Sequence, residues 1–199
     1  MKNVIKHSKK GILMVTLFAT LLSFANEASF YRIKNDAKRT SLTLRNVKKG
    51  NQLSIIDNHG VVLYKELIER SGIYTKGFDL TSLPDGSYIF ELDKDLEINK
   101  IPFTVTSNKV EFNKTGEKTI FKPYTRVKGN VVYVTKLALN EEPLKIEIYS
   151  RGSNGKELVF SEKIENTKNI QKAFRLPNLA KSNYKIVYYT DGRTFTSNI

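Results

Sequence analysis

The chain has 199 residues, of which 33 are lysine or arginine and 20 are aspartate or glutamate, so that its formal net charge is +13. It contains no cysteine and no tryptophan, and its two methionines are Met1 and Met14. This composition excludes disulfide bonds and thiolate metal sites, and His59 is the only histidine beyond the amino-terminal segment.

The amino-terminal segment has the pattern of an export signal. Lysines at positions 2, 6, 9 and 10 precede an uncharged apolar run from Gly11 to Phe24, which is too short to cross a membrane comfortably. Small residues at Ser23 and Ala25 suit signal peptidase, so we predict a signal peptide over residues 1–25 and export to the periplasm, the outer cell surface or the medium. An uncleaved membrane anchor is the alternative.

After this segment, apolar and polar residues alternate in short runs. The run LKIEIY from Leu144 to Tyr149 would turn its isoleucines inward and Lys145 and Glu147 toward water, as expected for a half-buried β-strand. Turn sequences separate such runs, among them DNHG at Asp57 to Gly60 and PDG at Pro84 to Gly86. The sequence therefore predicts an all-β fold.

A long phrase occurs twice at a constant offset. FDLTSLPDGSYIFEL begins at Phe78 and FRLPNLAKSNYKIVY begins at Phe174, and 174 − 78 = 96. The length differences between the copies fall in turns, where insertions disturb little buried backbone. We predict two tandem immunoglobulin-like antiparallel β-sandwiches, one over residues 26–106 and one over residues 107–199.

The repeated phrase suits the corner of an immunoglobulin-like sandwich. Tyr88 and Tyr184 would each send a hydroxyl back to upstream backbone while the ring packs inside. In the first copy, Leu83 would fill the core, Asp85 would bond nearby backbone and Gly86 would adopt a positive φ. The alternative is that the two tyrosines form a ligand site.

The first copy also resembles a known family. Its pattern of an apolar strand, an Asp-x-x-Gly turn, a second strand and then Leu-x-x-Leu-Pro-x-Gly-x-Tyr is similar to the carboxy-terminal sorting domain of type IX (Por) secretion. The resemblance covers about residues 42 to 105 and implies a small exported module of the Bacteroidetes type, delivered to the outer surface. The matching residues are Asp57, Gly60, Leu80, Leu83, Pro84, Gly86 and Tyr88.

Residues that could do chemistry are sparse. His59 lies inside a turn sequence and no GxSxG motif is present, so we predict that the protein is not an enzyme and needs no cofactor. Asp93, Asp95 and Glu97 in DKDLE could gather around calcium, but the glycine of an EF-hand loop is missing. A solvated turn is the favoured interpretation, and we predict no metal site.

The predicted function is that of a structural or protein-interaction module with a protein or cell-envelope partner, acting through strand edges and loops. The basic balance allows an alternative, the binding of acidic polysaccharide by a cationic face. Nucleic acid is not an expected partner of an exported protein, and no membrane span is expected after signal cleavage. The candidate residues for the cationic face are Lys48, Lys49, Lys122, Arg126 and Lys128.

Overall fold

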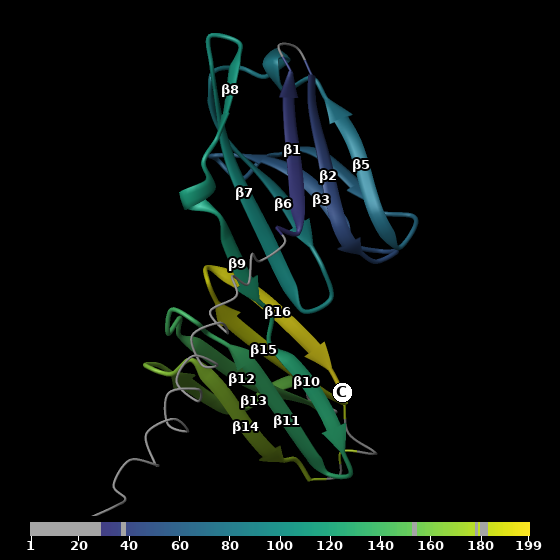
Figure 1. Cartoon of the computed structure of the whole chain (residues 1–199). Helices are drawn as coiled ribbons and strands as arrows, with labels where there is room; N and C mark the ends of the chain where they lie inside the picture. Colours follow the sequence, from purple (N-terminus) through teal and green to yellow (C-terminus); the bar gives the residue numbers. More distant parts are fainter. Residues whose placement is uncertain (1–28, 37–38, 153–154, 178, 180–182) are drawn as a thin grey trace, which may run out of the picture. The chain divides into compact units, whose positions relative to one another are not determined.

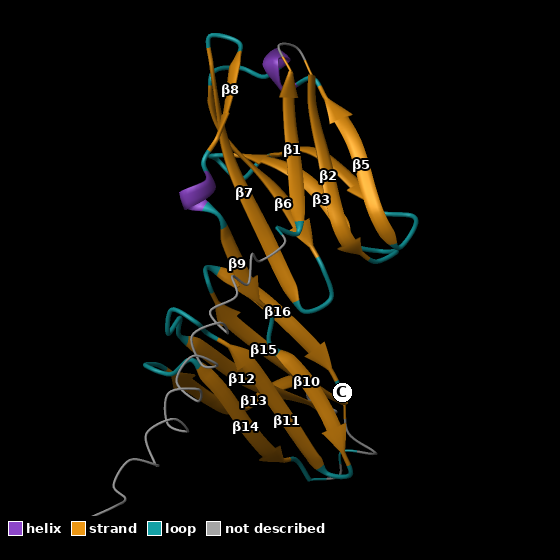
Figure 2. Cartoon of the chain, viewed as in Figure 1, coloured by secondary structure: helices purple, strands orange, loops and turns teal. Residues whose placement is uncertain are grey.

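The computed structural model describes residues 29–36, 39–152, 155–177, 179 and 183–199, and the predicted signal peptide lies outside them. The described chain is built from antiparallel strands with two short 3₁₀ turns (Figure 2), which confirms the predicted all-β fold. The elements are β1 (Tyr31–Asp36), β2 (Arg39–Val47), β3 (Gln52–Asp57), β4 (Val62–Leu67), β5 (Gly72–Phe78), η1 (Leu80–Ser82), β6 (Gly86–Asp93), β7 (Glu97–Thr106), β8 (Lys109–Phe112), η2 (Lys114–Gly116), β9 (Lys118–Phe121), β10 (Tyr124–Lys128), β11 (Val131–Leu137), β12 (Leu144–Gly152), β13 (Gly155–Ile164), β14 (Asn169–Arg175), β15 (Asn183–Thr190) and β16 (Arg193–Asn198).

The first sandwich consists of two sheets (Figure 1). Sheet A has the order β1-β2-β5, and sheet B has the order β4-β3-β6-β7-β8, with β9 also paired to β7. Aromatic rings connect the two sheets, because Phe78 of β5 lies 5.3 Å from Tyr64 of β4 and 5.1 Å from Phe90 of β6, measured between ring centroids. The core is therefore rich in aromatic side chains.

The second sandwich repeats this plan with sheet C, ordered β10-β11-β14, and sheet D, ordered β13-β12-β15-β16. Phe160 of β13 meets Phe174 of β14 across the sheets at a centroid distance of 5.0 Å. The rest of its core is mainly aliphatic. The buried members are Val132, Val134, Ala138, Leu144, Ile146, Ile148, Ile170, Leu176, Leu179, Tyr184, Ile186 and Tyr188.

Strand pairing changes partners later in the chain than the boundary expected after Thr106. Strands β8 and β9 lie beyond that residue, yet both pair with β7 and so belong to sheet B. The next strand, β10, begins at Tyr124 and pairs with β11 of sheet C. The pairing thus passes from one set of sheets to the other between Phe121 and Tyr124.

The predicted tyrosine corners are confirmed in both copies. The hydroxyl of Tyr88 donates to the backbone oxygen of Pro84 at 2.7 Å, and the hydroxyl of Tyr184 donates to that of Pro177 at 2.9 Å. Both tyrosines are buried, which is why their hydroxyls need an internal acceptor. The interpretation of these residues as a ligand site is not needed to explain them.

Three details of the first corner differ from expectation. Gly86 does not have a positive φ; it lies in β6 beside Tyr88, whose hydroxyl oxygen would be 3.4 Å from an added Cβ. Asp85 accepts a hydrogen bond from the distant backbone N–H of Ser107, at 2.9 Å. Leu83 is only half-buried, because Leu80 occupies the core position at this corner.

Candidate functional site

Consecutive exposed apolar residues lie on one edge strand of each sandwich. Strand β4 ends sheet B and β13 ends sheet D, so each has one unpaired side. Leu63 of β4 is 46% exposed, and Leu158 and Val159 of β13 are 50% and 48% exposed. We call these two strands the open edges. Exposed apolar strand edges are uncommon in monomeric proteins because they invite association.

Both open edges carry a bulge at the same place in the repeat. Opposite Ile55 and Ile56 of β3, strand β4 supplies Tyr64 and Val62, so Leu63 is the additional residue. In sheet D, the register of β12 with β13 likewise skips Val159. A bulge breaks the regular spacing of backbone donors and acceptors. The open edges are therefore better suited to contact through side chains than to extended strand addition.

An ion pair joins the two sheets beside each open edge. The carboxylate of Glu66 lies 2.5 Å from the ammonium of Lys76, and that of Glu162 lies 2.5 Å from Lys172. Glu66 also accepts from the hydroxyls of Tyr64 and Tyr74. The hydrogen bonds from Lys76 and Tyr64 hold the pKa of Glu66 below its usual value.

The structure gives two residues of the predicted cationic face acidic partners. Lys48 lies 3.2 Å from Asp95 in the turn between β6 and β7, and Lys122 contacts Asp93, the last residue of β6. Glu97, the first residue of β7, lies 2.7 Å from Lys94. Asp93, Asp95 and Glu97, the carboxylates considered for calcium, thus each form an ion pair with a lysine. No cluster of metal-ligating side chains occurs among the described residues.

The remaining residues of the predicted cationic face are spread over different elements. Lys49 lies in the turn between β2 and β3, whereas Arg126 and Lys128 lie on β10, an edge strand of sheet C. Because Lys48 and Lys122 are paired with acids, the five residues do not form one free cationic surface.

His59 lies where a turn residue was expected. Its backbone N–H donates to the side chain of Asp57 at 2.9 Å, and the following Gly60 has φ +84°. This is an Asp-stabilised hairpin turn, which needs glycine for the positive φ. The imidazole is not required for that geometry.

A polar network covers the outer face of sheet D. The hydroxyls of Tyr149 and Tyr189 donate to the carboxylate of Glu147 at 2.7 and 3.0 Å, and Lys145 lies 2.6 Å from the same carboxylate. The hydrogen bond from Lys145, followed by that from Tyr149, lowers the pKa of Glu147 to about 2. The carboxylate therefore stays ionised and fixes both tyrosine rings on this face.

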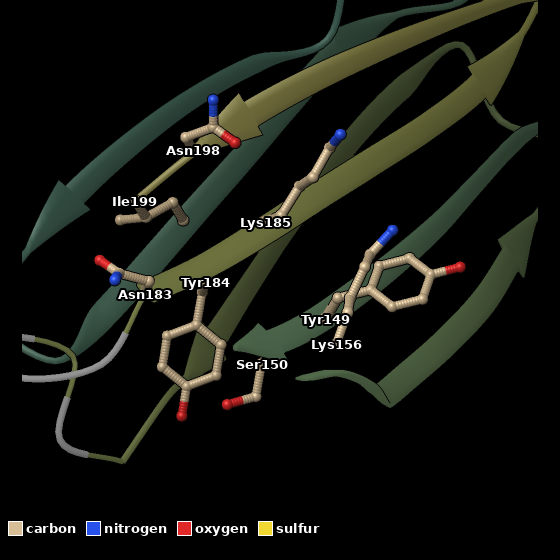
Figure 3. A pocket seen from close by; sticks show the side chains of 8 residues that line it. All are labelled: Tyr149, Ser150, Lys156, Asn183, Tyr184, Lys185, Asn198 and Ile199. Carbon is tan, nitrogen blue, oxygen red and sulfur yellow. The ribbon is translucent and has the colours of Figure 1, made fainter. Parts of the chain in front are cut away.

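A surface pocket of about 620 Å³ lies at the end of this face (Figure 3). Lys156 and Lys185 contribute two ammonium groups, and no carboxylate side chain lines the pocket. No local signal in the sequence marks this pocket, because its residues come from β12, β13, β15, β16 and Ile199 and converge only in the folded sheet. The lining residues are Tyr149, Ser150, Lys156, Asn183, Tyr184, Lys185, Asn198 and Ile199.

No family model matches the chain, and no curated protein matches it. One similar solved structure is described as "Biofilm associated protein - BSP domain", with 12% identity and a TM-score of 0.28 over 85% of this chain and 28% of that one. Another concerns neurohormone perception by the receptor tyrosine kinase Torso, with 7% identity and a TM-score of 0.26 over 86% of this chain and 72% of that one. TM-scores this low support no argument about fold or function.

The helical elements of the described residues are the short 3₁₀ turns η1 and η2, and neither could span a bilayer.

Proposed function

We propose that the protein is a non-enzymatic, exported structural and protein-interaction module, and that its main contact surface is the open edge formed by β13. The observation that carries the proposal is the exposed apolar centre of this strand, Leu158 to Phe160, on a strand with one unpaired side. Proteins normally cover an exposed apolar strand edge with another segment or place charged residues at its centre, which prevents association. An apolar centre left exposed therefore points to a contact surface.

The partner we propose for this edge is a second copy of the chain. The formal net charge is +13, which makes two copies repel each other over most of their surface. On β13 the charges cancel, since Lys156 and Lys163 balance Glu157 and Glu162. The open edge is therefore a place where like-charge repulsion is weak and apolar area can be buried.

The order of residues along β13 also suits a two-fold contact. Lysine and glutamate flank the apolar centre on both sides, so an antiparallel arrangement sets apolar residues against apolar residues. A register centred on Val159 places Leu158 of one copy opposite Phe160 of the other, so apolar side chains meet on both sides of the two-fold axis. Because Val159 is the bulge residue, side chains rather than a continuous ladder would carry this contact.

Sedimentation at several protein concentrations tests the proposal. We expect a reversible dimer for the wild type and a monomer for the double variant Leu158→Lys, Val159→Lys, because the added charges would be buried against a second copy. The matched control is Leu137→Lys, Leu139→Lys, which changes two exposed leucines outside the edge by the same charge. A wild-type protein that stays monomeric, or a control that dissociates equally, would rule the dimer out.

Export is a further part of the proposal, supported by the apolar run after the amino-terminal lysines. We expect the protein isolated from native cells to begin near Asn26. The resemblance to the type IX sorting domain supports delivery to the outer surface. Protease treatment of intact cells, with and without a working type IX translocon, tests this delivery; protection in both strains would contradict it.

Binding of acidic polysaccharide by the five predicted basic residues is not part of the proposal, since Lys48 and Lys122 already have acidic partners.

A further inference from the structure

The pocket on sheet D brings together two lysines without an acidic partner. Lys156 lies on β13 and Lys185 on β15, and both contribute to the pocket shown in Figure 3. Both side chains are exposed, and neither makes an ion pair with a described carboxylate. Two free ammonium groups on one pocket favour a ligand that carries negative charge.

The ammonium of Lys156 is held in position by its neighbours. It lies 3.6 Å from the centroid of the Tyr149 ring, a cation–π contact. The hydroxyl of that tyrosine donates to Glu147, so the ring itself is fixed. Lys185 stands directly opposite Tyr149 in the pairing of β12 with β15. The two charges are therefore presented from β13 and β15, the strands on either side of β12 in sheet D.

The other polar side chains of the pocket are neutral, and the main-chain oxygen of Ile199 already accepts a hydrogen bond from the backbone N–H of Tyr184 at 3.0 Å. Asn183 and Asn198 are amides and Ser150 is a hydroxyl, and each of these groups can both donate and accept a hydrogen bond. Ligand hydroxyls have the same double capacity, whereas a bare anion can only accept. A ligand that satisfies the whole lining thus carries a negative group together with several hydroxyls.

We propose that this pocket binds an acidic sugar, with its carboxylate between Lys156 and Lys185 and its hydroxyls toward the amides. The pocket volume of about 620 Å³ falls in the usual range for small-ligand sites and leaves room for more than one sugar unit. The site differs from the cationic face considered from the sequence, and it shares no residue with it.

The first sandwich supplies an internal comparison. By the register of the strands, the pair Ile56–Ile89 takes the place in sheet B that the pair Tyr149–Lys185 takes in sheet D. Isoleucine side chains are uncharged and cannot attract an anion, so only the second sandwich has the lysine and the tyrosine ring of this pocket. The proposal therefore predicts one site per chain.

The test is calorimetric titration of the full chain with a trisaccharide of galacturonic acid, with the neutral galactose trisaccharide as the paired ligand. We expect binding of the acidic ligand only. Lys156→Ala and Lys185→Ala should each weaken it about tenfold, the value of one charge-assisted hydrogen bond. Both lysines are exposed, so a thermal melt should show that the variants remain folded.

The matched control is the double variant Arg126→Ala, Lys128→Ala, which removes two positive charges from sheet C and leaves the pocket intact. If it weakens binding as much as the pocket variants do, the attraction is only that of net charge and the proposal fails. Equal binding of the neutral trisaccharide would also overturn it. The edge variant Leu158→Lys, Val159→Lys keeps every pocket residue, so loss of the dimer and loss of the sugar site can be told apart.

Discussion

The two sandwiches share their corners and edges and differ in their cores. Both copies have a tyrosine bonded to upstream backbone, an ion pair between the sheets and a bulge on the open edge. Those features fix backbone geometry. The cores, in contrast, are filled with different side chains. The corners and edges therefore depend on particular polar groups, whereas the cores depend mainly on apolar side chains that fill the available volume.

The difference is clearest at the inward position two residues after each corner tyrosine. Phe90 is fully buried in the first sandwich and its ring lies between 5.1 and 5.2 Å from those of Phe78 and Phe103, whereas the equivalent residue of the second sandwich is Ile186, also fully buried. Phe112 extends the aromatic cluster at 5.4 Å from Phe103. The first core thus contains a cluster of contacting rings at the place where the second core has an isoleucine.

The largest effect is expected from emptying these two positions. Phe90→Ala should lower the free energy of unfolding by about 4 kcal/mol and Ile186→Ala by about 3 kcal/mol, because each leaves a cavity and the larger ring leaves the larger one. Urea unfolding measures the free energy of unfolding of each variant. Amide hydrogen exchange shows where protection is lost, and equal loss in both sandwiches after either change would mean that they unfold as one unit.

A second contrast lies in two aspartates 96 positions apart. Asp95 is 65% exposed and pairs with Lys48, whereas the side chain of Asp191 is 2% exposed and pairs with Lys118 at 2.8 Å and Lys136 at 3.6 Å. Asp191→Asn should cost about 3 kcal/mol, because it leaves the buried Lys136 without a counter-charge. Asp95→Asn should cost less than about 0.5 kcal/mol.

The pKa of Asp191 also predicts how the stability difference between the wild type and Asp191→Asn changes in acid. Burial would raise the pKa of Asp191, but Lys118 and Lys136 outweigh it and the pKa is lowered. A lowered pKa in the folded state gives stability that is present above the unfolded value of about 3.9 and is lost as the pH falls further. Urea midpoints from pH 7 down to pH 3 should therefore converge for wild type and Asp191→Asn. A constant gap would contradict the assignment.

The corner tyrosines should respond alike in the two copies. Tyr88→Phe and Tyr184→Phe each remove a hydroxyl that satisfies a backbone oxygen, at 2.7 and 2.9 Å respectively. We expect each change to cost about 1 kcal/mol, since the ring still fills its place. Thermal unfolding of both variants measures this, and a cost in one copy only would show that the second corner is not equivalent to the first.

Local patterns in the sequence were enough to predict the all-β fold and the hydrogen bonds of the two corner tyrosines. Alternation and turn residues act over a few positions, and a repeated phrase shows that the same local solution is used twice. Sheet membership could not be read in this way. Strand β8 pairs with β7 across the two-residue turn of Ser107 and Asn108, which have positive φ without being glycine. Strand β9 returns to β7 from further along the chain, with Phe121 opposite Glu97, and only this folded pairing shows that it belongs to sheet B.

The candidate pocket was beyond sequence reasoning for the same reason. Tyr149, Lys156 and Lys185 lie on three strands, and only the register of sheet D brings them to one place. The charged residues that were chosen instead lie close together in sequence, as Lys48 with Lys49 and Arg126 with Lys128. Closeness along the chain gave no information about acidic partners such as Asp93 and Asp95.

The smallest effect is expected at the ion pairs beside the open edges. Both pairs are about one-third exposed, so screening by water leaves each worth less than a buried pair. Glu66→Gln should nevertheless cost about 1 kcal/mol, because Glu66 also accepts from Tyr64 and Tyr74, whereas Glu162→Gln should cost about 0.3 kcal/mol.

The cost of Glu66→Gln should also depend on pH. The pKa of Glu66 is lowered, mainly by the hydrogen bond from Lys76, so the cost should be present above about pH 4.3 and fade below it. Urea unfolding of both variants at pH 7 and pH 3.5 measures which change costs more and whether the cost of Glu66→Gln falls in acid. A larger cost for Glu162→Gln than for Glu66→Gln would contradict the stabilising role given to Tyr64 and Tyr74.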